Sequence, residues 1–473
     1  MIKPLTYLLF LSLVLLCHKS NAQSQIEIIN ADKISYNKKI NEDRQLLIGN
    51  VKTKHENRFL NCDSAYYYAK ENRIEAFDNI NIWQGDTLSL KGDYLIYHGN
   101  HQLAEIQRNV HFRHNEMTLE SQNLNFNFNI NEGYFDTKGT ITSKEKSLSS
   151  SKGVYYSDIE KFDFYGDVLV EDEKETLKAD TLFYWLKTEY ASFSSNGIIE
   201  NKDFEIKAQR GWVNQREGNA FLSSQVEITQ IEDAYKMYAD TCYISDQMKQ
   251  SISYGNTLLY LPFNSDSLYL TADTLINNQN TKLLKAYTKV SFKTESLTGH
   301  CDSLSYNTEN STIYLNSEPV LWLEDFQLTA DTITLLLLDD ELDKAYLNKN
   351  AFIASKLDSI SVNQISGVNM QANFKDNTLN TINVSGNGES IYYIEDEETG
   401  QNVGLNKIIC SNMDITIEQN KLKNIKFLEK PTATLYPIGD ITKDLRFLKH
   451  YKSHKKELIL KELESKTHVH KGF

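Results

Sequence analysis

The sequence predicts an all-β protein, an elongated and solenoid-like stack of short strands built from repeats of about 30 residues. A short motif recurs at nearly constant spacing, its apolar residues alternate as they do in strands, and helical periodicity is absent until the last part of the chain. The composition agrees with a folded protein. The 473 residues are 40% hydrophobic and include only 5 Pro and 20 Gly, which excludes a collagen-like, proline-rich or largely disordered chain.

The repeat is recognised by a small residue that is followed in most copies by Asp, as in Ala179-Asp180-Thr181-Leu182. We use the small residue as the anchor of each copy. The anchors are Ala31, Cys62, Gly92, Ser121, Ser151, Ala179, Ala208, Ala239, Ala272, Cys301 and Ala330. A unit of this length cannot bury its own apolar face, so neighbouring units are expected to stack and share one interior.

Three apolar columns accompany the anchors. A long apolar residue usually stands two positions before the anchor, an aliphatic residue three positions after it and an aromatic residue five positions after it. In a regular strand, the residues three and five positions after the anchor would point to the face opposite the anchor. One extra residue at the Asp position, as in a β-bulge, would bring them back to the same face, and this is the change of parity that we predict. We therefore interpret each Asp as the residue at which a strand turns a corner, hydrogen-bonded to its own backbone and not catalytic.

A second signature follows each anchor by about 18 residues and combines turn residues with a β-branched residue. Its copies are Gly49-Asn50-Val51, Asp78-Asn79-Ile80, Arg108-Asn109-Val110, Gly166-Asp167-Val168, Asn196-Gly197-Ile198 and Glu318-Pro319-Val320. We expect a turn at each of these places, followed by a short strand.

The sequence divides into four parts. Residues 1–22 are predicted to be a signal peptide, because Lys3 precedes an apolar run and small residues suit cleavage after Ala22. The regular repeat array is expected over 23–355, and a degenerate continuation of it over 356–440. Lipidation of Cys17 is disfavoured, because Leu16 before it is not small.

Residues 441–473 form a basic tail that is expected to be partly helical. Leu458, Ile459, Leu460 and Leu463 stand in a Lys-rich setting that favours a short amphipathic helix. Two roles are open for this helix, which would either cap the array or dock a partner. A solvated tail is the alternative.

Charge and motifs exclude several functions. The formal net charge of −14 opposes binding to nucleic acid. Phosphate-loop, serine hydrolase, zincin and C-x-x-C patterns are absent from the sequence. Cys62, Cys301 and Cys410 fill the small anchor position, which favours packing over disulfide bonding. We predict no enzyme activity, no catalytic residue, no metal site and no cofactor.

The exported start, the A-D-x-L-x-Y strand and the following G-N-V turn, repeated at this spacing, resemble the OstA-like family. That family contains the periplasmic lipopolysaccharide-transport protein LptA and the N-terminal domain of its outer-membrane partner LptD. The resemblance implies a β-jellyroll of stacked antiparallel strands whose interior holds the acyl chains of lipid A. It also implies pairing through edge strands with other lipopolysaccharide-transport proteins, namely an inner-membrane complex and an outer-membrane LptD-like protein.

The resemblance therefore implies a non-enzymatic conduit in the periplasm, associated with the cell envelope, that carries lipopolysaccharide towards the outer membrane. The groove-lining residues it implies occupy the apolar columns: Leu60, Leu90, Tyr97, Leu119, Phe126, Leu177, Leu182, Tyr184, Leu270, Leu275, Leu304, Tyr306 and Leu328. Two other functions stay open. One is a structural or adhesive exported β-solenoid with a filled core, and the other is a carbohydrate-active β-helix enzyme.

Overall fold

The computed structural model describes residues 24–36, 43–232, 235–246, 249–263, 266–339, 341–358, 360–375, 378–396, 399–418 and 421–471. The expected signal peptide, residues 1–22, lies outside these ranges. The chain forms two compact units. Unit 1 comprises Met1–Glu173 and Thr181–Lys187, and unit 2 comprises Lys174–Asp180 and Thr188–Phe473. Strand β14 (Glu175–Trp185) contributes residues to both units.

Unit 1 consists of antiparallel strands in which each long strand pairs with the next along the chain. Its elements are β1 (Glu27–Asn30), β2 (Lys33–Tyr36), β3 (Arg44–His55), β4 (Arg58–Tyr68), β5 (Arg73–Gln84), β6 (Leu88–His98), η1 (Gly99–His101), β7 (Leu103–His114), β8 (Met117–Asn127), β9 (Glu132–Phe135), β10 (Gly139–Ser143), β11 (Lys146–Ser150), β12 (Lys152–Tyr156) and β13 (Lys161–Glu171).

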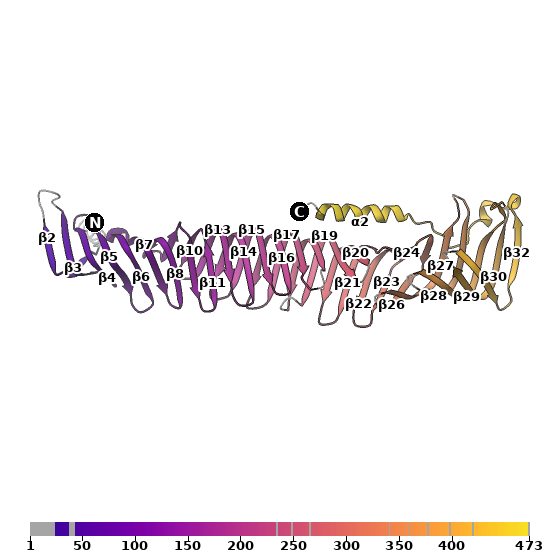
Figure 1. The fold of residues 1–473 in the computed structure, drawn as a ribbon, viewed down its shortest axis with the longest axis horizontal. Coiled ribbons are helices and arrows are strands. Elements are labelled where there is room, and N and C mark those ends of the chain that lie inside the picture. The colour runs from indigo at the N-terminus through magenta and orange to yellow at the C-terminus, as the bar shows by residue number, and fades with distance from the viewer. Residues whose placement is uncertain are drawn as a thin grey trace, which may run out of the picture. The chain divides into compact units, whose positions relative to one another are not determined.

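Unit 2 continues the same antiparallel pattern (Figure 1). Its strands are β15 (Tyr190–Asn201), β16 (Phe204–Asn214), β17 (Asn219–Gln230), β18 (Lys236–Ser245), β19 (Gln250–Phe263), β20 (Asp266–Asn278), β21 (Leu283–Lys293), β22 (Leu297–Asn307), β23 (Thr312–Asn316), β24 (Val320–Leu323), β25 (Phe326–Thr329), β26 (Thr332–Leu338), β27 (Glu341–Lys356), β28 (Val362–Lys375), β29 (Thr378–Glu395), β30 (Asn402–Glu418), β31 (Lys421–Leu428) and β32 (Thr432–Pro437). Its helical elements are η2 (Ile438–Asp440), η3 (Lys443–Leu445) and α2 (Lys456–Lys471).

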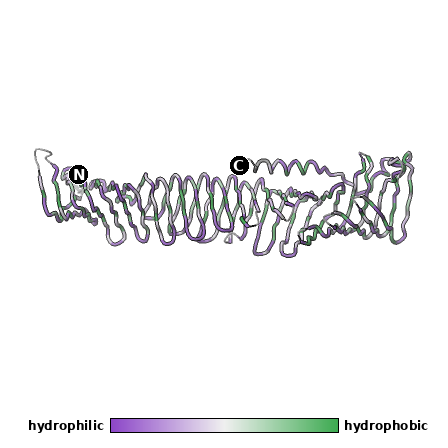
Figure 2. Tube along the Cα trace, viewed as in Figure 1, coloured by the Kyte–Doolittle hydropathy of each residue, from purple (hydrophilic) through white to green (hydrophobic). Residues whose placement is uncertain are grey.

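Most long strands bend once, and the bend divides the strands of each unit into two layers. Strand β8 shows this directly, because its first residues pair with β10 and its last residues pair with β9. We call the layer that holds the residues before the anchor layer 1, and the layer that holds the residues after it layer 2. In β4 the buried residues include Leu60 and Cys62 before the bend, then Ala65 and Tyr67 after it. This pattern confirms the predicted change of parity, and Figure 2 shows hydrophilic and hydrophobic residues alternating along the strands.

The bend is made by two consecutive residues with a left-handed backbone. In β3 these are Gly49 and Asn50, with φ of 76° and 46°, and they interrupt the pairing with β4 between Ile48 and Val51. The prediction of a chain-reversing turn at this signature is therefore wrong, because the structure has a bulge there. The chain does not reverse there but continues as one bulged strand, and hairpin turns lie at the strand ends instead.

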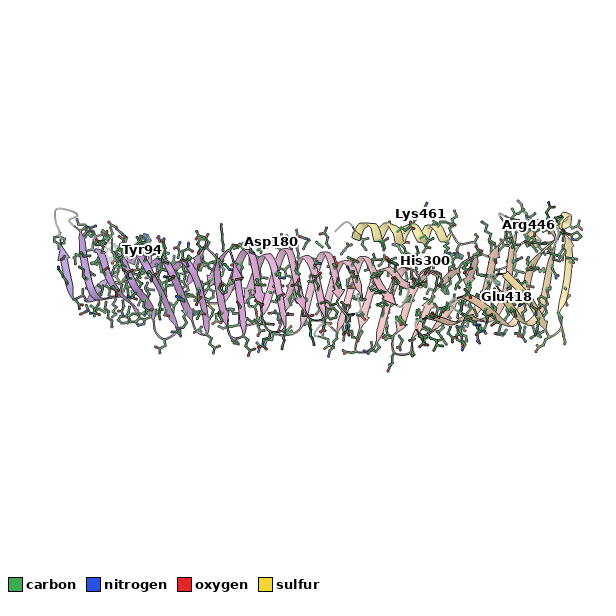
Figure 3. The ribbon with its side chains drawn as sticks, viewed as in Figure 1. Tyr94, Asp180, His300, Glu418, Arg446 and Lys461 are labelled. Carbon is green, nitrogen blue, oxygen red and sulfur yellow. The ribbon has the colours of Figure 1, made fainter. Side chains whose placement is uncertain are left out.

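The last part of unit 2 folds back over its strands. Residues beyond β32 form a segment, 438–471, that we call the C-terminal arm; it ends in α2, which packs against β19, β20, β21 and β22 (Figure 1). Figure 3 labels Lys461 on α2 and His300 on β22 below it. The predicted helix is present, and it covers the outer surface of its own unit.

The predicted fold class is confirmed: stacked antiparallel strands with a period of about 30 residues and a C-terminal helix. The expected boundaries near residues 355 and 440 stay predictions.

Candidate functional site

The predicted lining residues point into the two-layered interior. Each of them is buried except Tyr306, which is partly exposed. Their surroundings differ, however. Leu270, Leu304 and Tyr306 border an open cavity in unit 2, whereas Leu90, Leu119 and Phe126 in unit 1 are fully buried at 0% exposure.

The cavity in unit 2 has a volume of about 140 Å³ and lies among strands β19 to β27. We call it the apolar cavity. Besides the three predicted residues, its walls include apolar side chains that the sequence columns did not contain: Leu261, Leu268, Leu284, Phe292, Leu297, Ile313, Leu335, Leu337 and Leu342. Leu270, Leu304 and Tyr306 are thus the predicted residues that border this cavity, and most of its lining lies outside the predicted columns.

The positions of these additional residues explain why the sequence columns did not include them. Leu268 stands two residues before Leu270 on the same face of β20, so strict alternation would have found it. Leu284 and Ile313 lie directly opposite Tyr306 on the neighbouring strands β21 and β23. Those strands carry no anchor, and only strand pairing places them beside the column.

Polar residues at strand ends border the apolar cavity. They are Asp266, Thr294, Ser296 and Glu341. The Asp266 carboxylate accepts hydrogen bonds from the backbone N–H of Ser267 (2.6 Å) and from the backbone N–H of Glu295 (3.1 Å). The rim is therefore polar and acidic while the walls are apolar.

A second cavity of unit 2, with a volume of about 200 Å³, lies among strands β25 to β31. Its walls include Ile353, Ile365, Ile382 and Ile415. Ser390 also lines it, and the buried Oγ of Ser390 has no hydrogen-bond partner among the described residues. This second space extends the apolar interior towards the last strands.

Between β7 and β13 the interior of unit 1 is filled by aromatic rings, whereas the predicted residues Leu60 and Tyr97 border a space of about 10 Å³ among the first strands. Phe112 in layer 1 meets Phe126 and Tyr155 in layer 2, with ring centroids 5.1 Å and 5.8 Å apart. Tyr155 stacks on Phe162, which stacks on Phe164, at 4.5 Å and 4.9 Å. These rings are at most 1% exposed, so no water-sized space adjoins them.

Polar bonds join the two layers of unit 1 at the strand ends. The Tyr97 hydroxyl is hydrogen-bonded to Nδ1 of His55, and the Tyr155 hydroxyl to Nδ1 of His114, each at 2.7 Å. Burial raises the pKa of Tyr97 to about 12, and burial lowers the pKa of His114. Burial raises the pKa of Tyr155 as well, so both Tyr hydroxyls keep their protons at neutral pH.

The Asp column forms a regular series of side-chain bonds on the outer surface at the bends. The Asn of the left-handed pair donates its Nδ2 to the Asp carboxylate of the preceding strand, as in Asn79 to Asp63 (2.7 Å) and Asn196 to Asp180 (2.6 Å). Figure 3 labels Asp180 at such a bend. The Asp residues are corner residues as predicted, but here the partner is this Asn side chain and not the backbone of the Asp itself.

The cysteines occupy packing positions. Cys62, Cys242, Cys301 and Cys410 are free and buried, and burial raises the pKa of Cys62 and Cys301 to about 12. Within the described part of the chain, no group of three His, Cys, Asp or Glu residues could hold a metal ion. No helix among the described residues is long and apolar enough to cross a bilayer.

Three family models match parts of the chain. Residues 23–180 match the model described as OstA-like protein, and residues 134–232 match that of LptC-related lipopolysaccharide-assembly proteins. Residues 205–341 match the model of the LptA/(LptD N-terminal domain) lipopolysaccharide-transport protein. No curated protein sequence matches the chain.

One similar solved structure is LptH from Pseudomonas aeruginosa, described as the LptA homologous periplasmic component of the conserved lipopolysaccharide transport device. The identity is 13% and the TM-score 0.23, over 24% of this chain and 82% of that chain.

The matching models define a class, the lipopolysaccharide-transport proteins, whose members are non-enzymatic transport components. Within that class, residues 23–180 are similar to the OstA-like proteins.

Proposed function

We propose that this protein is a periplasmic conduit that carries lipopolysaccharide towards the outer membrane, with the acyl chains of lipid A held in the apolar interior of unit 2. The observation that carries the proposal is the apolar cavity between the two layers, where Leu270, Leu304 and Tyr306 meet further leucine side chains. Burial of hydrocarbon contributes about 0.8 kcal/mol per CH₂ group, so such walls bind acyl chains without specific polar contacts.

The charge distribution supports an arrangement with the lipid head group outside. The rim residues Asp266 and Glu341 are acidic, and the whole chain has a formal net charge of −14. Both features repel the phosphates of lipid A, and the interior offers them no cation among the residues that line the cavity. We place the phosphates in water beyond the rim and only the acyl chains inside.

The proposed partners bind through the edge strands. Exposed apolar residues lie on an early strand of unit 1 and on the last strand of unit 2. They include Ile34 of β2 and Leu435 of β32, which are 55% and 62% exposed. Open edges with apolar side chains favour pairing with a strand of another chain. We propose that they pair with other lipopolysaccharide-transport proteins, an inner-membrane complex at one end and an outer-membrane LptD-like protein at the other. Removal of the signal peptide after Ala22 and a location in the periplasm belong to the same proposal.

Leu304→Asp tests the proposed binding interior. Leu304 is 6% exposed and lines the apolar cavity, so an unpaired carboxylate there opposes acyl-chain burial. We expect lipid A recovered with the purified protein, measured by mass spectrometry, to fall at least about tenfold. Leu304→Trp, which fills the space with apolar atoms, is a second variant expected to lower recovery if the charged one folds poorly.

Ser305→Asp is the matched control, because Ser305 is the next residue of β22 and points to the opposite face. It is expected to retain lipid A at the level of the unchanged protein. Recovery of undiminished lipid A from folded Leu304→Asp and Leu304→Trp proteins would contradict the proposed interior.

A further inference from the structure

Between β7 and β13 the interior of unit 1 is filled, so an acyl chain cannot enter this part of it unless side chains move. Phe112, Phe126, Tyr155, Phe162 and Phe164 occupy the space between its layers and are at most 1% exposed. A space that excludes one water molecule also excludes a hydrocarbon chain, so the rings and an acyl chain cannot occupy this interior together.

Glycine residues in the surrounding strands make room for the aromatic rings. A Cβ atom added at Gly139 or Gly153 would lie within 2.5 Å of the Phe135 ring, and one at Gly133 would lie 3.1 Å from the Phe126 ring. Glycine at these three positions lets the strands approach the rings closely. The filled state is therefore a specific packing of this segment and not a chance collapse.

Tyr155 connects the ring cluster to the strand ends. Its ring contacts Phe112 and Phe162, and its hydroxyl is hydrogen-bonded to Nδ1 of His114, which is in layer 1. Beside this bond, Asn115 of the same layer donates its Nδ2 to the Glu160 carboxylate of layer 2 at 3.0 Å. Lys187 forms an ion pair with Glu160 at 3.3 Å. Opening the layers of unit 1 at this place requires that these bonds break.

We propose that Tyr155 and His114 form a latch that holds an aromatic gate, made of Phe112, Phe126, Tyr155, Phe162 and Phe164, closed to acyl chains in unit 1. The inference rests on the proposed function and deepens it. With the gate closed, acyl chains bind in unit 2, and they enter this part of unit 1 only when the latch opens and the rings move aside. Tyr155 is a positioning residue, because it sets the distance between the layers.

The test uses the full chain and a lipid A that carries a photoreactive diazirine on an acyl chain. After irradiation, mass spectrometry of peptides gives the labelling of β6 to β13 in unit 1 and of β19 to β27 in unit 2. In the unchanged protein we expect labelling of unit 2 to exceed that of unit 1. Tyr155→Phe keeps the ring and removes the hydrogen bond, which is expected to raise the labelling of unit 1 about fivefold.

Phe162→Ala removes a gate ring and is expected to raise the labelling of unit 1 in the same direction. Tyr94→Phe is the control, because the Tyr94 hydroxyl donates a hydrogen bond to Glu75 (2.8 Å) away from the gate. It should leave the ratio between the units unchanged. Thermal unfolding of each variant verifies that the protein is folded.

Two results would overturn the gate while leaving the proposed function intact. The first is equal labelling of both units in the unchanged protein. The second is strong labelling of unit 2 together with labelling of unit 1 that neither Tyr155→Phe nor Phe162→Ala changes. Absence of labelling from both units would instead overturn the proposed function, and the gate with it.

Discussion

Asn196 shows how one side chain supports the bend of a strand. It has a φ of 53° and follows Ser195, whose φ is 71°, so two adjacent residues adopt a conformation that most side chains disfavour. The Nδ2 of Asn196 donates a hydrogen bond to Asp180 at 2.6 Å. Asn tolerates the left-handed region better than most residues, and the bond to Asp180 fixes the bend relative to the neighbouring strand.

Asn196→Ala is expected to destabilise the protein by about 1–2 kcal/mol, because Ala is disfavoured in the left-handed region and cannot form the bond. Asn196→Gly keeps the backbone conformation and loses only the side-chain bond, so it should destabilise less. Calorimetric unfolding of the two variants gives the comparison. Equal stability of the Ala and Gly variants would show that backbone conformation is not what selects Asn here.

At the scale of the element, the C-terminal arm is attached by two glutamines that each bind its backbone twice. Gln364, fully buried, donates to the carbonyl of Arg446 (2.8 Å) and accepts from the N–H of Leu448 (2.9 Å). Gln327 does the same with the carbonyl of Lys452 (2.8 Å) and the N–H of His454 (3.0 Å). Figure 3 labels Arg446 near the last strands of unit 2.

The attachment also buries an apolar surface. Leu448 packs with Phe352, Val362, Ile391 and Leu405 on the outer face of layer 1. Further along, Leu463 of α2 is buried, and the ammonium group of Lys466 donates to the hydroxyl of Thr271 (2.6 Å). Burial lowers the pKa of Lys466. The arm is thus a packed part of unit 2.

Gln364→Ala is expected to loosen residues 441–454, because Arg446 and Leu448 would each lose a buried hydrogen bond. Hydrogen exchange followed by mass spectrometry should show faster exchange of this segment, by about tenfold, with the strands of unit 2 little changed. Gln371→Ala, in the same strand and bonded locally to Asn373, is the control. Unchanged exchange of the arm in Gln364→Ala would show that apolar packing alone holds it.

At the scale of the whole molecule, the sequence predicted what depends on the repeat and missed what depends on contacts between distant residues. The anchors and columns identified Leu270 and Leu304 as interior residues, because periodicity determines which face is buried. The Gly49-Asn50 signature was interpreted as a turn, since the same residues form turns and bulges. The docking of Lys466 on Thr271 could not be predicted, because nothing local in the sequence links the two residues.

The end strands give a prediction that concerns the assembled protein. Leu435→Lys places a charge on the exposed side chain of β32, and charged residues at an edge hinder strand addition. With a photo-crosslinking amino acid at Ala433, we expect this change to reduce crosslinks to the neighbouring protein in intact cells by at least about fivefold. Leu458→Lys alters a leucine of α2 that is 59% exposed, and it should have no effect. Full crosslinking of the Leu435→Lys protein would contradict pairing at this edge.

The arm has a consequence for the order in which the molecule is built. Successive strands contact their immediate neighbours, so these contacts are local in the sequence and can form before the last residues take part. Residues 446, 448 and 466, in contrast, bind partners that precede them by 82, 84 and 195 positions. Until residues beyond 441 have docked, Phe352 and Ile391 stay uncovered on the surface. A chain truncated before residue 441 would therefore expose this apolar surface to proteases and chaperones, whereas the C-terminal arm covers it in the full-length protein.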